Sequence, residues 1–372
     1  MRNFANVKRI VIKVGTNTLT KEGRIDTEYI KGLSGQIAEL LKQNRQALLV
    51  TSGAIGMGAG QLALSGPVAD TKMRQACAAI GQPLLMHEYH RAFSQQGLQT
   101  AQVLLTAEVL SKRKSYLNLR NAVETLLNLG VVPVLNENDS VSTDEIGTAF
   151  GDNDKLSALV ASKIDADLLI LLTDIDALYD KDPRKNPDAK PIRLVEEITE
   201  AISKAAGGRG SAHSTGGMKA KLAAAKIAST AGCQIVLAHG REPQVLQRIL
   251  AGEEIGTLFV PKGRMSNRQR WILHSKPEGT IHIDDGAAAA LRKHKSLLPS
   301  GVVKVEGTFA AGTVVMINDC AKAVASLNSA ELREFAGKHS SQIRKALGDS
   351  RRDVAATPED IVFLDNPAGD LP

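Results

Sequence analysis

The sequence is poor in aromatic residues and cysteines, and it has no long uninterrupted apolar run. Aromatic residues make up 3% of its 372 residues. Its three cysteines, Cys77, Cys233 and Cys320, are widely spaced and form no Cys-x-x-Cys pair, which argues against a disulfide framework and a zinc site. No stretch of about 18 apolar residues occurs, and the amino terminus lacks the pattern of a secretion signal. These absences predict a cytoplasmic protein with no membrane partner.

Signatures of several common enzyme classes are also missing. No Gly-x-x-x-x-Gly-Lys-Ser/Thr string is present, which excludes a P-loop ATPase at the sequence level. Residues 87–90 hold two histidines without the i, i+4 spacing of a zinc-binding helix. The glycines after residue 52 do not have the spacing of a dinucleotide fingerprint. Any nucleotide site must therefore be of another kind.

Apolar residues are abundant enough for two folded domains. They make up 43% of the chain, and charged residues make up 23%. The net charge of +6 is unevenly placed, because residues 261–276 contain five basic residues and no acidic residue. We interpret this segment as a solvated connector or a helix-end face, with an anion or nucleic-acid contact as the alternative.

Short apolar runs alternate with stretches of helical period as far as residue 240. Expected strands lie near residues 8–14, 46–50, 131–135, 167–172 and 234–238. Expected helices lie near residues 27–43, 72–95, 111–129, 152–163 and 218–231. This alternation predicts an α/β fold with an open, mostly parallel sheet between layers of helices, and with ligands at the carboxyl ends of the strands.

The pattern changes after residue 276. Short β candidates occur at residues 280–283, 302–306, 313–317, 321–326 and 361–364, with one helix near 285–294. We expect a small, mainly β domain there. The predicted organisation is a first domain over 1–260, a basic linker over 261–279 and a second domain over 280–366.

Two lysines about two hundred residues apart are set in glycine-bearing turns. Lys13 ends an apolar run and is followed by Gly15. Lys221 follows the glycine turn of residues 214–217 and begins an Ala-rich helix. A phosphoryl group in transfer needs fixed cations and backbone amides around its oxygens. The two turns therefore predict a phosphotransferase.

Polar residues gather after the other expected strands. Ser52 and Gly53 follow the second strand, Asn138 and Asp139 follow the third, and Thr173 and Asp174 follow the fourth. Turn capping is the alternative interpretation of such residues. Asp139 could hold a substrate ammonium group. Residues 152–154 begin a helix and carry more acids than an N-cap requires, so we assign Asp154 the role of positioning both lysines.

These segments, in this order, resemble the amino acid kinase family over about residues 8–260. The resemblance is carried by residues 13–15, 51–55, 136–139, 150–154 and 215–221. The segment from about 280, including residues 284–287 and 296–301, resembles a PUA domain. The resemblance implies the amino acid kinase fold, an open and mostly parallel sheet sandwiched by helices, followed by a small PUA domain.

The branch of this family with an appended PUA domain transfers the γ-phosphate of ATP to the side-chain carboxylate of L-glutamate, as the first step of proline biosynthesis. The resemblance therefore implies ATP and L-glutamate as substrates. It implies Mg²⁺ held mainly by the ATP phosphates, with no protein metal ligand assigned. Feedback inhibition by proline and a homo-oligomer, a dimer or tetramer, are further implications.

The same resemblance assigns roles to individual residues. Catalysis would depend on Lys13, Lys221 and Asp154. Substrate binding would involve Ser52, Gly53, Ala54, Asn138, Asp139, Asp152 and Asn153. ATP binding would involve Lys13, Gly15, Thr173, Asp174, Thr215, Gly216, Gly217, Met218, Lys219, Ala220 and Lys221. No covalent intermediate and no general base are required, because the accepting carboxylate is already ionised at neutral pH.

Three alternatives stay open. Another amino acid kinase, such as an acetylglutamate kinase, is the nearest, and its usual lack of an appended β domain counts against it. An RNA-binding PUA protein is the second, but residues 277–372 hold 11 basic and 13 acidic residues, which disfavours binding to a phosphate backbone. A catalytically inactive regulatory relative is the third, and the retained lysines and acids disfavour it.

Overall fold

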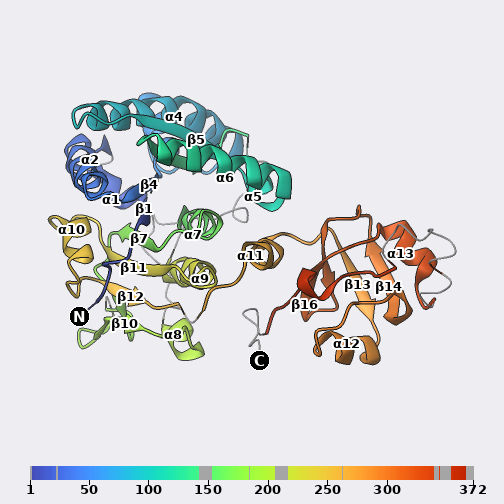
Figure 1. Ribbon diagram of the computed structural model, residues 1–372. Helices are drawn as coiled ribbons and strands as arrows, with labels where there is room; N and C mark the ends of the chain where they lie inside the picture. Colours follow the sequence, from blue (N-terminus) through green and yellow to red (C-terminus); the bar gives the residue numbers. More distant parts are fainter. Residues whose placement is uncertain are drawn as a thin grey trace. The chain divides into compact units, whose positions relative to one another are not determined.

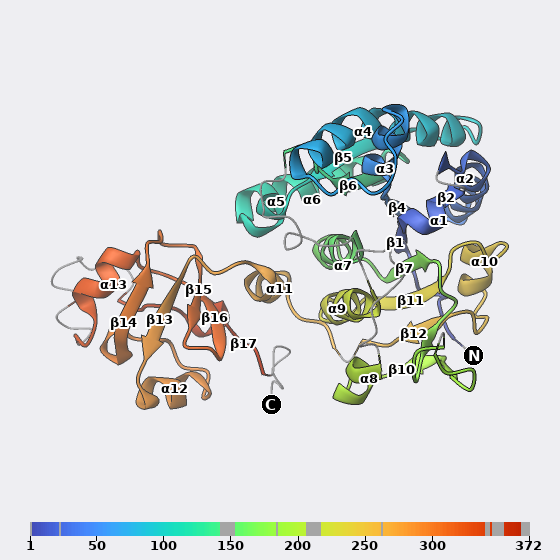
Figure 2. The same cartoon turned by 180° about the vertical axis from the view of Figure 1, so that it is seen from behind.

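The computed structural model describes residues 2–21, 24–141, 153–183, 185–205, 217–261, 263–338, 343 and 353–365. The chain divides into two compact units, Met1–Arg264 and Met265–Pro372 (Figures 1 and 2). The division falls within the segment 261–279 that the sequence analysis assigned to a linker. The exact domain limits proposed from the sequence stay predictions.

The first unit is built on an eight-stranded sheet in the order β10-β12-β11-β7-β1-β4-β6-β5. All its strand pairs are parallel except β11 with β12. The strands are β1 (Arg9–Val14), β4 (Gln46–Val50), β5 (Thr100–Leu105), β6 (Val132–Glu137), β7 (Leu168–Thr173), β10 (Leu194–Val195), β11 (Gln234–His239) and β12 (Thr257–Phe259). The predicted α/β class with a mostly parallel sheet is confirmed.

Helices cover both faces of this sheet. One face packs against α5 (Ala107–Ser111), α6 (Arg113–Asn128), α7 (Asn153–Lys163), α8 (Glu200–Ala205) and α9 (Met218–Ser229). The other packs against α2 (Thr27–Lys42), α3 (Ala54–Gln61), α4 (Thr71–Ser94) and α10 (Val245–Leu250). Successive strand residues point to opposite faces, so Leu48 joins the first core and Leu49 the second.

Smaller elements complete the first unit. Helix α1 (Thr16–Leu19) follows β1 directly, and two hairpins are formed by β2 (Thr20–Lys21) with β3 (Arg24–Ile25) and by β8 (Leu178–Tyr179) with β9 (Pro191–Ile192). Strand β1 lies between β4 and β7, so the chain runs to one side of β1 first and to the other side later. The crevice at the carboxyl end of such a reversal is the usual ligand site of an open α/β sheet.

The strands and helices expected from the sequence correspond to β1, β4, β6, β7, β11, α2, α4, α6, α7 and α9. Strand β5 was missed because it lies at the sheet edge, is only partly buried and mixes polar with apolar residues. Strands β10 and β12 were missed because they have only two and three residues.

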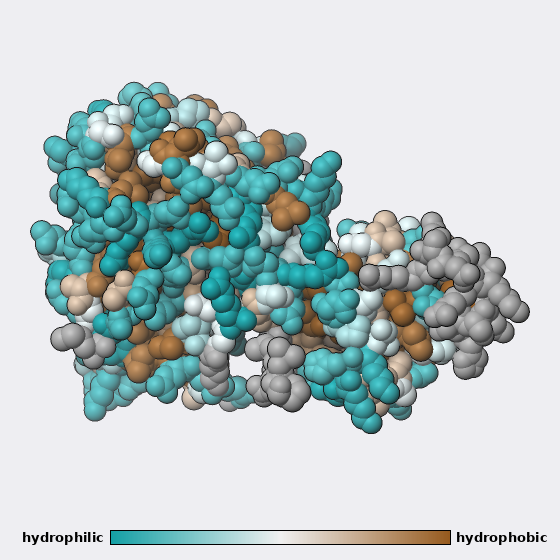
Figure 3. All heavy atoms as spheres, in the orientation of Figure 1, coloured by the Kyte–Doolittle hydropathy of each residue, from teal (hydrophilic) through white to brown (hydrophobic). Residues whose placement is uncertain are grey.

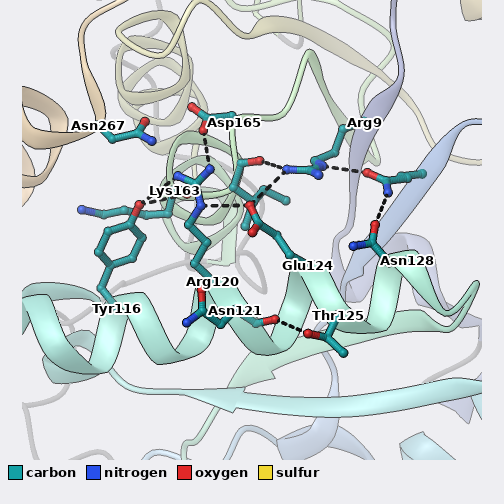
Figure 4. A network of polar contacts seen from close by, with 12 residues as sticks. Arg9, Tyr116, Arg120, Asn121, Glu124, Thr125, Asn128, Lys163, Asp165 and Asn267 are labelled. Carbon is teal, nitrogen blue, oxygen red and sulfur yellow. Dashed lines mark hydrogen bonds and ion pairs between the residues drawn. The ribbon is translucent and has the colours of Figure 1, made fainter.

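A network of charged side chains lies at the amino-terminal edge of the sheet (Figure 4). Arg120 of α6 donates from Nε to Glu124 Oε1 over 2.9 Å and pairs through Nη2 with Asp165 Oδ2 over 2.9 Å. Arg9 of β1 donates to the carbonyl of Ile164 and lies 3.9 Å from Glu124 Oε1. This network fixes the turn that follows α7, at the end of the helix opposite Asp154.

The second unit contains a five-stranded sheet in the order β14-β13-β15-β16-β17. Its strands are β13 (Gly279–Ile283), β14 (Val302–Gly307), β15 (Val314–Ile317), β16 (Ala321–Val324) and β17 (Ile361–Phe363), and its helices are α11 (Asn267–His274), α12 (Asp285–Leu291) and α13 (Ser329–Phe335). The predicted small, mainly β domain is confirmed as a fold class. Helix α13 was not expected.

Helix α11 forms within the segment assigned to a solvated linker. Its Ser266 and Gln269 make a capping box, and Trp271 and Ile272 are buried against the β-sheet of the same unit. Lys322 Nζ donates to the carbonyls of Leu273 and Ser275 over 2.8 Å each, which satisfies the end of this helix. Much of the segment is therefore a packed part of the second unit.

Hydrophilic side chains cover most of the face of the first unit that Figure 3 shows, with hydrophobic side chains in separate patches. None of the helices in the described ranges is long and apolar enough to cross a membrane.

Helices α3 and α4 approach so closely that glycine is required between them. A Cβ atom on Gly81 would lie less than 3.0 Å from the carbonyl oxygen of Ala54.

We expect Gly81→Ala to lower the free energy of unfolding by about 1–3 kcal/mol, because the backbone of α3 or of α4 must move to make room for the methyl group. Gly60 is exposed on α3 with open space around it, so Gly60→Ala should cause no loss and a gain of up to about 1 kcal/mol. Urea unfolding of both variants tests this, and equal effects would contradict it.

Candidate active site

Three buried charged side chains meet at the carboxyl end of the central strands. Lys13 Nζ lies 2.6 Å from Asp154 Oδ1, and Lys221 Nζ lies 2.9 Å from Asp154 Oδ2. The exposed fractions of these side chains are 4% for Lys13, 1% for Asp154 and 9% for Lys221. One carboxylate thus holds both lysines, each with a different oxygen. The structure brings together the three residues that the sequence analysis assigned to catalysis.

The fold explains why these residues meet. Lys13 is two residues after Val11 in β1, so both point to the sheet face that α7 and α9 cover. Asp154 is in the first turn of α7, and Lys221 is one turn into α9. The two helices lie side by side in both ribbon views. Their amino-terminal ends therefore reach Lys13 from the same side.

The electrostatic balance of this group favours an anionic ligand. Two lysines and one aspartate leave a net charge of +1 in a place that water scarcely reaches. Burial of charges is costly, and the ion pairs with Asp154 offset part of this cost for each lysine. The amino-terminal ends of α7 and α9 add backbone amides and a partial positive charge. An arriving phosphoryl group would complete the balance.

A second polar network joins four elements beside this group. Asn153 Nδ2 donates to Ser52 Oγ over 3.0 Å and to Asn136 Oδ1 over 2.9 Å. Asn136 is 2% exposed, and its own Nδ2 donates to Gln82 Oε1 of α4 over 2.8 Å. The ends of β4 and β6 are thereby joined to α4 and to the first turn of α7. This fixes Asn153 immediately beside Asp154.

Helix α4 makes a second contact with the site two turns later. The hydroxyl groups of Tyr89 and Thr51 lie 2.8 Å apart, and both residues are fully buried. Gln82 and Tyr89 are seven residues apart and therefore lie on one face of the helix. The predicted site residues Gly53 and Ala54 begin α3, with Gly53 at φ 97° as its N-cap.

The turn after β6 places Asn138 and Asp139 at the same edge of the sheet. The Asn138 amide hydrogen-bonds to the Leu105 carbonyl over 2.8 Å, and its side chain accepts from Ser140 Oγ over 2.7 Å. Burial raises the pKa of the Asp139 carboxyl, and the positive charge of Arg74 opposes this rise in part. Asp139 is therefore a half-buried acid without full compensation from the protein.

The end of β7 carries the predicted nucleotide residues. Thr173 Oγ1 donates to Asp174 Oδ1 over 3.0 Å, and Asn17 Nδ2 of α1 donates to Asp174 Oδ2 over 2.8 Å. Burial would raise the pKa of Asp174, but these hydrogen bonds and the charge of Lys221 together hold it below its usual range. Gly15 donates its amide to the Leu172 carbonyl over 3.1 Å, which connects the β1 turn to the same strand.

The glycine turn before Lys221 is described only in part. Gly217 is the N-cap of α9, and Met218, Lys219 and Ala220 form the first turn of this helix. The predicted residues Asp152, Thr215 and Gly216 lie outside the described residues. All individual binding and catalytic roles stay predictions, although the described residues from the three lists do gather around the ends of β1, β4, β6 and β7.

Sequence reasoning did not assign roles to Asn17, Gln82, Tyr89 and Asn136. Asn136 stood inside a segment already singled out, so its position after an apolar strand was an available signal. Gln82 and Tyr89 are isolated polar groups in a long helix, and no sequence pattern marks the face on which they lie.

The site can be tested for its fit to Mg²⁺. No cluster of three or more His, Cys, Asp or Glu side chains that could hold a metal ion occurs in the part of the chain that is described. Mg²⁺ commonly needs only one or two protein carboxylates when nucleotide phosphates supply other ligands. Asp174, the carboxylate at the end of β7, fits such a role.

We expect Asp139→Asn to raise the free energy of unfolding at pH 7 in the absence of substrates. A raised pKa means that the folded protein binds the proton more tightly than the unfolded chain does. The ionised Asp139 therefore lowers the free energy of unfolding of the wild-type protein. This loss should be complete above the pKa of Asp139 in the folded protein, and it should vanish as the pH falls toward 3.8, the ordinary pKa of an aspartate.

Urea unfolding at several pH values measures this difference. Glu196 is exposed and provides the control, and Glu196→Gln should change the free energy of unfolding by no more than about 0.5 kcal/mol. A variant Asp139→Asn that is less stable than the wild type at pH 7 would refute the account.

Comparison with known proteins identifies the families to which the two parts of the chain are similar. Residues 8–239 match the amino acid kinase family, and residues 279–347 match the PUA domain. A protein of Methanosarcina mazei named glutamate 5-kinase is 45% identical over 376 residues, covering 97% of each chain. A glutamate 5-kinase of Caldanaerobacter subterraneus is 46% identical, covering 96% of this chain and 98% of the relative.

A solved structure supports the fold of the first unit. Carbamate kinase from Giardia lamblia bound to AMP-PNP aligns with a TM-score of 0.52 at 17% identity, covering 69% of this chain and 99% of the other. The chain therefore belongs to the amino acid kinase family and carries a C-terminal PUA domain.

Proposed function

We propose that this protein transfers the γ-phosphate of ATP to the side-chain carboxylate of L-glutamate, giving L-glutamyl 5-phosphate and ADP. The observation that carries the proposal is the buried group of Lys13, Asp154 and Lys221. Near-full-length relatives named glutamate 5-kinase support the choice of substrate. The reaction would begin proline biosynthesis.

The main difficulty of this reaction is the repulsion between two anions. The lysines would bind the oxygens of the transferring phosphoryl group, where charge is spread in the transition state. Asp154 would keep both cations in place before the substrates arrive, which lowers the reorganisation needed during the reaction. Mg²⁺ would arrive with the ATP phosphates and neutralise part of their charge.

The two substrates would occupy different sides of this group. The network of Ser52 and Asn153, with Asp139 nearby, would hold the amino acid. Thr173, Asp174 and the first turn of α9 would hold the nucleotide.

We further propose that the protein is a cytoplasmic homo-oligomer and that proline inhibits its activity.

An assay of ADP release tests the substrate. L-Glutamate, N-acetylglutamate, aspartate and carbamate are compared in parallel with ATP and Mg²⁺. We expect turnover with free glutamate alone, because the proposed site offers an acid to a free ammonium group. A higher kcat/KM for N-acetylglutamate would overturn the assignment.

A variant at Lys221 tests the catalytic group. Lys221→Ala should lower kcat about a hundredfold or more with a modest change in the KM of glutamate, because the lysine acts on transition-state charge. Lys226 lies exposed on the same helix, so Lys226→Ala should leave kcat within about twofold. With circular dichroism confirming a folded Lys221→Ala protein, an unchanged kcat would remove Lys221 from the mechanism.

A further inference from the structure

Helix α4 buries a glutamine beside the polar network of the site, and the network uses only one end of its side chain. Gln82 is 8% exposed. Its Oε1 accepts a hydrogen bond from Asn136 Nδ2 over 2.8 Å, whereas its Nε2 is buried without a hydrogen-bond partner among the described residues. A buried amide nitrogen without a partner is unfavourable, so the contribution of this side chain comes from its oxygen.

Two backbone groups fix which end of each amide in the network faces which neighbour. The Glu137 N–H can only donate, and it lies 2.9 Å from Asn136 Oδ1. The Thr51 carbonyl can only accept, and it lies 2.5 Å from Asn153 Nδ2. Asn136 Oδ1 also accepts from Asn153 Nδ2 over 2.9 Å, in agreement with both constraints. The nitrogen of Asn136 is then left facing Gln82, which must offer an oxygen.

The same orientation decides what the ends of β4 and α7 offer to a ligand. Asn153 already uses its nitrogen on three protein oxygens, and its Oδ1 accepts no hydrogen bond within the described ranges, so this oxygen is left for a ligand. Ser52 Oγ accepts from that nitrogen over 3.0 Å and cannot donate to it, so its proton is also left for a ligand. One acceptor and one donor suit a ligand with an ammonium group and carboxylate oxygens.

Loss of the acceptor at position 82 would upset this orientation. The nitrogen of Asn136 would be buried without a partner. Turning the Asn136 amide over would not help, because its nitrogen would then face two other donors, the Glu137 N–H and Asn153 Nδ2. Asn136 would have to move, and the side chain of Asn153 would lose one of its fixed contacts.

Helix α4 is itself anchored at this turn. A Cβ atom on Gly81 would lie less than 3.0 Å from the Ala54 carbonyl oxygen, so the backbone next to Gln82 lies directly against α3. Two turns later, the hydroxyl groups of Tyr89 and Thr51 lie 2.8 Å apart. The network therefore starts from a side chain whose backbone is fixed.

We propose that Gln82 is a positioning residue for the amino-acid substrate. It holds Asn136 so that Asn153 offers its carbonyl oxygen, and Ser52 its hydroxyl proton, to the ligand. Gln82 acts through Asn136 and does not itself touch the substrate. This inference rests on the proposed function, in which Ser52 and Asn153 bind the amino acid.

The first test removes the acceptor without shortening the side chain. Gln82→Met should raise the KM of glutamate about tenfold or more, and it should leave kcat within about threefold and the KM of ATP within about twofold. This division is expected because the change reaches the side chain of Asn153 and not the helical turn that carries it. Gln82→Glu should recover most of the loss, because a carboxyl oxygen can still accept from Asn136.

A double-mutant cycle separates positioning from a general weakening of the fold. In an Asn153→Ala protein the carbonyl oxygen to be positioned is gone, so adding Gln82→Met should raise the KM of glutamate by less than about twofold further. Effects that simply multiply would show that Gln82 does not act through this network.

A second glutamine of the same unit provides the matched control. Gln36 of α2 accepts a hydrogen bond from the Leu246 amide over 3.0 Å and joins α2 to α10, neither of which carries a residue assigned to the amino acid. Gln36→Met also removes an acceptor, and it should leave the KM of glutamate within about twofold. Urea unfolding of both variants shows whether a change in KM merely follows a loss of stability.

The outcomes that overturn the inference differ from failure of the proposed function. If Gln82→Met leaves the KM of glutamate within twofold, raises the KM of ATP by the same factor, or is not rescued by Gln82→Glu, then Gln82 does not position the amino-acid site. If Gln82→Met does not fold, Gln82→Ala gives the same test without the bulk of methionine. If the wild-type protein neither phosphorylates nor binds glutamate, the proposed function itself is wrong.

Discussion

The position of Asp154 between two lysines constrains much of the first unit. Removing the carboxylate would leave two buried lysines short of negative charge, and removing the lysines would leave a buried carboxylate short of positive charge. The three residues come from β1, α7 and α9, which are distant in sequence. Strand and helices must therefore dock in one relative arrangement for the charges to balance, and that arrangement leaves a surplus of positive charge at the edge where ligands bind.

A layer of buried amides and hydroxyls supports this charged group. Asn136, Gln82 and Asn153 connect β6, α4 and α7, and the glycines between α3 and α4 allow these helices to approach closely. The charged network of Arg120 and Asp165 fixes the opposite end of α7 (Figure 4). Helix α7 is thus held at both ends.

Much of the architecture could be predicted from the sequence because its central strands are continuous apolar runs followed by polar residues. Lys13, Asp154 and Lys221 could be selected for the same reason, since each stands where an apolar strand ends or a helix begins. Edge strand β5 could not, because it is only partly buried. Helix α11 could not, because it has only eight residues and most of them are polar or charged. The contacts of Gln82 and Tyr89 were beyond prediction because no sequence pattern shows which face of α4 meets the ends of β4 and β6.

Asn153 and Asp154 are consecutive residues, so their Cα atoms are only about 3.8 Å apart. Asn153 belongs to the network of buried amides and hydroxyls, and Asp154 holds the two lysines. A small rotation of this single helical turn would therefore disturb the amide network and the lysine pair together.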